Sequence, residues 1–461
     1  MNTIDIKNGK IAQTLVALSI PVLIGQAFNL LYTIVDTWFI ARIDQTDPWL
    51  VGATGLVFPI FFFFMAASFG ISGGISSLVS RAIGAERSKE LDRTAESGFF
   101  LAIITSVIIL AVIYPLSTPL LRLFGGIGQI LQYGKAYLLW LLPVVPFMML
   151  NAVFTGILQG EGRTKYIMIA MMSGTIANIV LDPVFIFGMN MGIAGAGLAT
   201  AAGNAISTVY LLAVFIKLES QVKIHWKTNY ISFPVIGEIL RVGIPQSLMN
   251  FLNSISFIFY NRIMIDINPM ILTSFTLYSR LEQFALIPIW SIMSGLGAIA
   301  GQAAGARNFD RMKRTVKVSS LIGMLVTGSL LLIFVFSSSW LFRLFQSDPE
   351  VLSLAQVIAP WMAAASFFSV PIFMITGVMS AAGFANRSLA ITASRIYALN
   401  VPACIIGAYL IGKDVHSVMV SIFLSSLIAL LVTIITNKSF FKGLETGKLT
   451  IHYSSNSDTA G

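Results

Sequence analysis

Twelve long apolar segments, separated by short polar gaps, constrain this chain more than any other feature of its sequence. Each segment has at least the roughly 20 residues that a helix needs to cross a bilayer core. Charged residues make up only 11% of the 461 residues, against about 25% in soluble domains. We therefore predict an all-α polytopic membrane protein with twelve transmembrane helices. The predicted spans are 11–41, 50–80, 96–117, 128–158, 166–188, 193–216, 236–265, 270–301, 315–339, 351–381, 388–411 and 415–437.

The sequence lacks the residue clusters that most metal centres and hydrolytic enzymes need. Cys404 is the only cysteine, and the three histidines, His225, His416 and His452, lie far apart, which argues against an intramolecular disulfide framework or a thiolate zinc site. No Walker A, HExxH or GxSxG motif occurs. We expect neither an enzyme nor a resident metal or cofactor, so energy for transport must come from elsewhere.

The net charge of +9 arises from Lys and Arg residues in the gaps between apolar segments, which disfavours nucleic acid as a partner. These residues are frequent in alternate gaps, such as 81–93 and 307–317, and sparse in the others. Because cytoplasmic loops concentrate Lys and Arg, the pattern predicts that both termini and the central linker are cytoplasmic. Membrane lipid is the expected surrounding.

An internal repeat divides the chain into two six-span halves. It is carried by three matches: 81–93 with 302–314, 156–165 with 377–387, and Pro21 with Pro245. An even number of spans per half means that both halves enter from the same side, so we expect a parallel repeat about an axis along the membrane normal. The predicted parts are an N-terminal lobe 1–216, a cytoplasmic linker 217–235, a C-terminal lobe 236–437 and a cytoplasmic tail 438–461.

Two acidic residues lie deep inside predicted spans. Asp36 is far along the first span, and Asp182 stands in the fifth, directly before Pro183 and one helical turn after Asn178. An ionised Asp at mid-membrane costs about 2.5–3.5 kcal/mol on insertion scales, so each needs a reason to be there. One interpretation is a proton or cation site, and the other is a helix-end residue or one bonded to a nearby hydroxyl.

The second half does not repeat these acids, so the sequence confines the coupling site to the N-terminal lobe. The positions that match Asp36 and Asp182 are Tyr260 and Ala403. Other charged residues do lie within the spans of the second half, namely Arg280, Glu282 and Arg395. Glu282 is either a second ion or substrate site, or one member of a structural ion pair with an arginine.

Four segments of the chain resemble a known transporter family. They are IPVLIGQAFNLLYTIVDTWFIA, SRAIGAERSKELDR, ILQGEGRTK and ANIVLDPVFIFG. Together they are similar to the multidrug and toxic compound extrusion (MATE) family, and within it to the DinF-like prokaryotic branch. The resemblance implies a two-lobed antiporter of the prokaryotic plasma (inner) membrane that exports cationic amphiphiles in exchange for protons or sodium ions. We expect it to act as a monomer on small organic cations.

The same resemblance implies roles for particular residues. The coupling-ion cluster of that branch falls on Asp36, Asn178, Asp182 and Thr200, and its kink-forming proline falls on Pro21. The sodium-coupled NorM-like branch also uses acids in the seventh and tenth spans, and here 236–265 and 351–381 have none in mid-helix. This favours proton coupling, with sodium binding at the same two carboxylates as the alternative.

Polar and aromatic residues form the predicted substrate contacts. Gln26, Asn29 and Tyr32 precede Asp36 at helical spacing, so one stripe of the first span carries all four. Aromatic rings attract organic cations and Met side chains repack easily, which suggests a further set of contacts in Tyr137, Phe154, Met172 and the run 58–65. Ordinary helix packing is the alternative for most of them.

Three other functions compete with multidrug export. A lipid-linked precursor flippase of the same superfamily would be expected to have extra spans and basic cavity residues, and the sequence has neither clearly. A membrane-embedded enzyme would need a catalytic cluster, and a channel a selectivity filter or a ring of pore residues.

Overall fold

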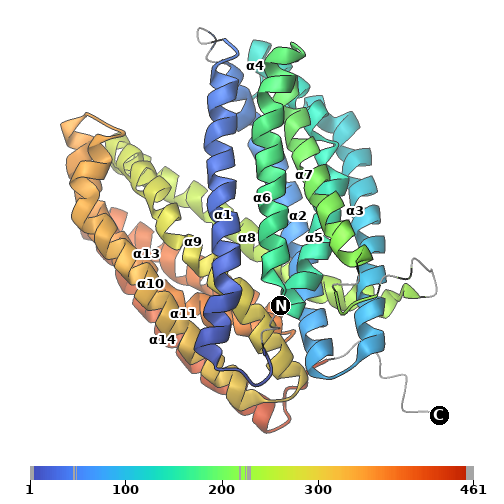
Figure 1. Ribbon diagram of the computed structural model, residues 1–461. Helices are drawn as coiled ribbons and strands as arrows, with labels where there is room; N and C mark the ends of the chain where they lie inside the picture. Colours follow the sequence, from blue (N-terminus) through green and yellow to red (C-terminus); the bar gives the residue numbers. More distant parts are fainter. Residues whose placement is uncertain are drawn as a thin grey trace. The chain divides into compact units, whose positions relative to one another are not determined.

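The computed structural model describes residues 5–44, 47, 49–217, 220–223, 225 and 230–452, and every regular element within them is a helix (Figure 1). The elements of the first half are α1 (Ile11–Ala41), α2 (Trp49–Gly84), α3 (Ser88–Leu123), α4 (Gly128–Leu141), α5 (Val144–Glu161), α6 (Thr164–Pro183), the π-helical η1 (Val184–Gly188) and α7 (Ile193–Ile216). Those of the second half are α8 (Phe233–Ile267), α9 (Pro269–Gly305), α10 (Phe309–Arg343), α11 (Pro349–Ala381), α12 (Ala385–Ala393), the π-helical η3 (Ser394–Asn400), α13 (Val401–Ile406), the π-helical η4 (Gly407–Ile411) and α14 (Val415–Glu445).

The prediction of an all-α membrane protein is confirmed. In the described part of the chain, eleven helical segments are long and apolar enough to cross a membrane. The twelfth predicted span lies in α8, which is long enough but contains three amide side chains in its central stretch, Gln246, Asn250 and Asn253. Several helices extend beyond the predicted spans, as α3 does at both ends of 96–117.

Proline residues interrupt the predicted spans at defined places. The span 128–158 consists of two helices, because α4 ends at Leu141 and Pro143 precedes α5. Pro183 ends the α-helical part of α6, and the next turn is π-helical, with the amide of Met189 donating to the carbonyl of Val184 at 2.8 Å. A proline has no amide hydrogen to donate to the preceding turn, which accounts for the irregular backbone.

The described residues form two compact units. The N unit comprises Ile20–Ile244, and the C unit comprises the described residues before Ile20 together with Pro245–His452. These boundaries differ from those of the predicted lobes, because the start of α1 groups with the second half and residues 217–244 group with the first. Parts of the predicted linker, at 218, 219, 224 and 226–229, and the tail residues 453–461 lie outside the described residues.

Backbone geometry reproduces the sequence repeat within each unit. Glu86 follows α2 with φ of 60°, and Arg307 follows α9 with φ of 53°, at the offset of 221 residues. Gly162 and Gly383 have the same relation, with φ of 74° and 92°. All four positions lie in the left-handed region where helices commonly end, so the repeated segments specify the same helix-ending turn in both halves.

Candidate functional site

Two glycines let α6 and α7 approach closely in the N unit, where the helices run side by side (Figure 1). A Cβ atom on Gly203 would lie 2.7 Å from the carbonyl oxygen of Gly174, and one on Gly174 would lie 3.0 Å from that of Gly203. Small residues permit such backbone contact between membrane helices. One turn from the contact, the close approach brings Asn178 of α6 against Thr200 of α7.

Asp182 and Asn178 form the centre of a polar cluster. Asp182 is fully buried, and Asn178 is 3% exposed. In the amide orientation that matches donors with acceptors, the Asn178 nitrogen donates to Asp182 Oδ2 at 3.3 Å, and its oxygen accepts from the Thr200 amide at 3.1 Å. Asp182 Oδ1 is buried and has no hydrogen-bond donor among the described residues.

Helix α1 contributes the second carboxylate. The Tyr32 and Thr200 hydroxyls lie 3.3 Å apart, which places this face of α1 at the cluster. Asp36, one turn further along, is 8% exposed, and its Oδ1 is also buried without a donor in the described part of the chain. Asp36 and Asp182 interact electrostatically, and Tyr137 of α4 interacts with both. The structure thus brings together the four residues of the predicted coupling cluster, with Tyr32 and Tyr137 beside them.

Sequence reasoning missed a polar network that continues from Thr200. The Asn204 side chain donates to the Thr200 carbonyl at 3.0 Å, and the Asn151 side chain donates to the Asn204 carbonyl at 3.2 Å. The Thr208 hydroxyl donates to Asn151 Oδ1 at 2.9 Å. The four-residue spacing of Thr200, Asn204 and Thr208 is a signal that could have revealed the α7 side of this network.

The other predicted N-unit residues lie in varied surroundings. Gln26 and Met172 are half-buried, and Asn29 is exposed. Phe154 is 2% exposed and packs in the apolar core, with its ring centroid 5.0 Å from those of Phe99 and Phe215, which favours the helix-packing alternative for this residue. Pro21 lies within α1 and is half-buried, and the helix is continuous through it.

In the C unit, the expected ion pair between Glu282 and Arg280 is not formed among the described residues. Glu282 Oε1 instead accepts hydrogen bonds from the hydroxyls of Tyr278, at 2.8 Å, and Ser366. Arg280 is exposed. Residues two apart on a helix do not share a face, so the carboxylate takes its partners from one turn earlier and from α11.

Arg395 is the other charged residue within the C unit that the sequence analysis singled out. One of its guanidinium nitrogens lies 3.5 Å from Asn253 Oδ1, and its Cζ lies 5.2 Å from the Phe373 ring centroid. The nearby Asn400 accepts a hydrogen bond from the Ser425 hydroxyl at 3.0 Å. The halves therefore differ in the charge of their polar clusters, with two carboxylates in the N unit and a guanidinium in this part of the C unit.

Long apolar helices in two repeated halves, with buried carboxylates inside one of them, define a multi-pass membrane transport protein. The sequence profile of the MatE family matches this chain twice, over residues 21–184 and 245–406, and the chain belongs to that family.

Curated relatives and solved structures agree with this assignment. The multidrug export protein MepA of Staphylococcus haemolyticus (strain JCSC1435) is 25% identical over 379 residues, covering 82% of this chain and 83% of that protein. MepA of Staphylococcus aureus (strain MSSA476) is 25% identical over 419 residues, covering 90% and 91%. The crystal structure of a MATE protein in complex with MaD5 superimposes with a TM-score of 0.90 at 25% identity, covering 97% of this chain and 99% of that one.

Proposed function

We propose that this protein is a secondary antiporter that exports cationic amphiphilic compounds in exchange for protons, by alternating access. The observation that carries the proposal is the pair Asp36 and Asp182, each buried with one carboxylate oxygen that no described donor satisfies. A buried acceptor without a partner is costly, and binding a proton removes that cost. Release of the proton leaves a negative charge that attracts an organic cation.

Electrostatics links the two carboxylates in one exchange cycle. Because they interact with each other, protonation of one changes the free energy of ionising the second. Asn178 and Thr200 hold Asp182 in place, and Tyr32 joins α1 to the same cluster. We propose that substrate contacts come from the neighbouring stripe of Gln26 and Asn29 and from Tyr137, Met172 and Phe154, and that Pro21 serves as a hinge in α1.

The names of the relatives support the substrate class, because the staphylococcal relatives are named multidrug export proteins. We place the protein in the prokaryotic plasma membrane as a monomer with both termini in the cytoplasm. Sodium coupling is the second candidate, since carboxylate oxygens without donors also suit a hard cation.

Transport by the purified full-length chain in liposomes tests the proposal. We expect an imposed proton gradient to drive an ethidium-like cation against its concentration gradient, whereas a sodium gradient at equal pH does not. Transport driven by sodium alone would replace the proton with sodium at the carboxylates. Transport of anionic conjugates with no movement of cations would reject the substrate class.

A further inference from the structure

A basic recess lies between α10 and α14 of the C unit, outside the carboxylate cluster. Its volume is about 270 Å³, and its lining residues are Lys313, Asn437, Lys438, Phe441, Lys442 and Glu445. Sites for drug-sized ligands have volumes of roughly 300–1,000 Å³ and mostly apolar walls. A recess of this size with three lysines fits a small anionic group better than an organic cation.

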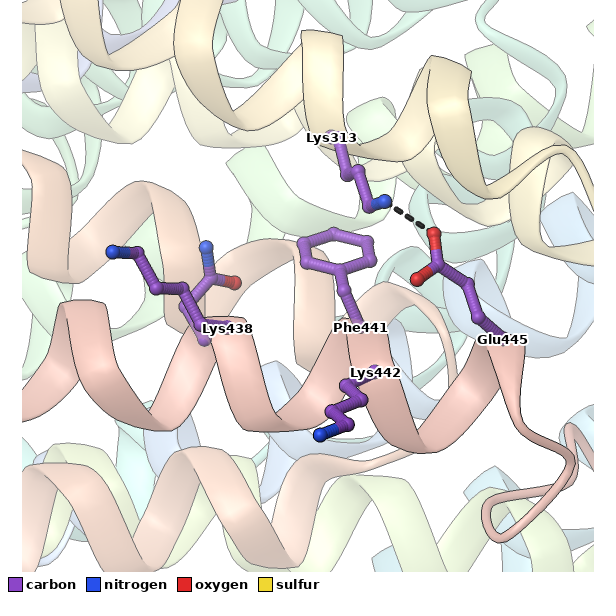
Figure 2. A pocket seen from close by; sticks show the side chains of 6 residues that line it. Lys313, Lys438, Phe441, Lys442 and Glu445 are labelled. Atoms are coloured by element: carbon purple, nitrogen blue, oxygen red, sulfur yellow. Dashed lines mark hydrogen bonds and ion pairs between the residues drawn. The ribbon is translucent and has the colours of Figure 1, made fainter.

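One of the three lysines is held in place within the recess. Figure 2 shows Lys313 extending from α10 toward α14, where its ammonium group pairs with Glu445. The same nitrogen lies 5.8 Å from the centroid of the Phe441 ring. These contacts fix one wall, and Glu445 offsets only one of the three positive charges.

The other two lysines lie on one face of α14. Lys438 and Lys442 are four residues apart, so both can approach the same ligand. Both side chains are exposed, and neither forms an ion pair with an acidic residue in the described part of the chain. An ammonium group is a compact point charge and a common phosphate ligand.

The position of the recess along α14 indicates the source of the anion. On the helical stripe that carries the two lysines, Leu431 and Ile435 are 61% and 68% exposed, as expected of side chains that face lipid tails. Lys438 follows Ile435 after three residues, about 4.5 Å further along the helix axis. The lysines therefore lie just beyond the apolar band, at the level where lipid headgroups begin.

The other half of the repeat has no such recess at the matching place. The counterpart of Lys313 is Asp92, which accepts a hydrogen bond from the Lys223 amide at 2.9 Å and lies 3.1 Å from His225 Nε2. Helix α7 ends at Ile216, and the chain after it covers the start of α3, whereas α14 continues to Glu445. The basic recess is thus a particular feature of the C unit.

We propose that this recess binds the phosphate of an anionic membrane lipid, with Lys438 and Lys442 as its ligands and Lys313 completing the positive wall. Asn437 can add a hydrogen bond through its amide. The inference is independent of the exported substrate and of the coupling ion.

Lipid titration of the purified full-length chain in detergent tests this site. We expect dioctanoyl-phosphatidylglycerol to raise the melting temperature at concentrations where dioctanoyl-phosphatidylcholine does not. The double variant Lys438→Gln/Lys442→Gln should bind phosphatidylglycerol at least about tenfold more weakly, because each lysine contributes electrostatic attraction. The variant Lys438→Arg/Lys442→Arg should retain binding, and added salt should weaken it.

The matched control is Lys89→Gln/Lys165→Gln, which removes two exposed lysines from the N unit. We expect it to bind phosphatidylglycerol as the wild type does. An equal loss of binding in this control would overturn the proposal in favour of general surface charge. Binding of inorganic phosphate alone with the same dependence on Lys438 and Lys442 would overturn the lipid assignment in favour of a soluble anion.

Discussion

The two halves of this transporter end their helices alike but differ in their buried charges. The left-handed residues Glu86 and Arg307, and likewise Gly162 and Gly383, fall at the same offset and terminate equivalent helices. The carboxylates of the N unit, in contrast, have uncharged counterparts, Tyr260 and Ala403. The backbone turns are needed by both halves in order to fold, whereas an ion-coupling site is needed only once.

The ends of the last helix in each half differ in a similar way. After α7, the chain of the N unit is held down by Glu161, whose Oε1 accepts hydrogen bonds from the Ser220 hydroxyl and the Gln221 amide, both at 2.7 Å, and from the Val222 amide at 3.2 Å. After the corresponding point in the C unit, α14 continues as a helix and forms the basic recess. One half uses this region for packing, and the other offers it to a ligand.

The largest expected effect separates the carboxylates of the two units. Asp36→Asn and Asp182→Asn should each abolish gradient-driven efflux, because an amide does not exchange a proton in this range of pH. Glu282→Gln should reduce transport only about two- to fivefold, since it changes hydrogen bonds to Tyr278 and Ser366. The measurement is proton release from the solubilised protein on addition of a cationic substrate. Normal release in both Asp variants, with its loss in Glu282→Gln, would move coupling to the C unit.

The second test compares the matching prolines. Pro21→Ala restores a backbone donor within α1 and should lower transport about tenfold at unchanged expression, if the missing hydrogen bond allows the helix to bend. Pro245→Ala makes the same change in α8 and should leave transport within about twofold, because α8 carries no coupling acid. Rates in liposomes check both. Full transport by Pro21→Ala would remove the hinge from the mechanism.

A smaller effect should follow from Thr200→Val, which keeps the shape of the side chain and removes the hydroxyl next to Tyr32. We expect a two- to tenfold lower transport rate, in the range of about one lost hydrogen bond. Ser425→Ala removes the hydroxyl that bonds Asn400 in the C unit and should not change the rate. Equal losses in the two variants would show that both polar clusters take part in transport.

The smallest effect on transport is expected for Glu161→Ala, which should leave the rate within twofold. It removes the acceptor for three donors and should lower the free energy of unfolding by about 1–3 kcal/mol. Trypsin should then cleave faster at Lys217 and Lys223, and thermal denaturation gives the loss of stability. The control Glu445→Ala breaks an exposed ion pair, worth about 0–1 kcal/mol. A larger loss in the control would contradict the comparison.

Spans, repeat and carboxylates could be predicted because a bilayer leaves few alternatives. Apolar length requires helices, and a buried Asp is rare enough to attract notice. Helix ends were harder, since α3 begins eight residues before the predicted span, in the charged segment that precedes the apolar run. The hydroxyl partners of Glu282 were not predictable, because Ser366 is 84 residues away and no spacing rule connects the two.

Asn151 illustrates the same limit within the N unit. A single Asn in α5 has no periodic partner on its own helix, and its function is visible only when α7 lies against it. Thr200 was identified through resemblance to a family motif, whereas Asn204 and Thr208 lay outside that motif. Contacts between helices determine such networks, and one sequence read along its length does not contain them.

The grouping of the start of α1 with the C unit has a consequence for biosynthesis. Arg311 donates hydrogen bonds to the carbonyls of Ile6, at 2.7 Å, and Gly9, at 2.9 Å, and Gly295 packs closely against Leu15 and Leu18. Arg311 leaves the ribosome 296 residues after Leu15, which takes about 15–60 s at 5–20 residues per second. The first segment to be translated must therefore wait for partners that are made much later, so the C unit completes its packing only near the end of synthesis.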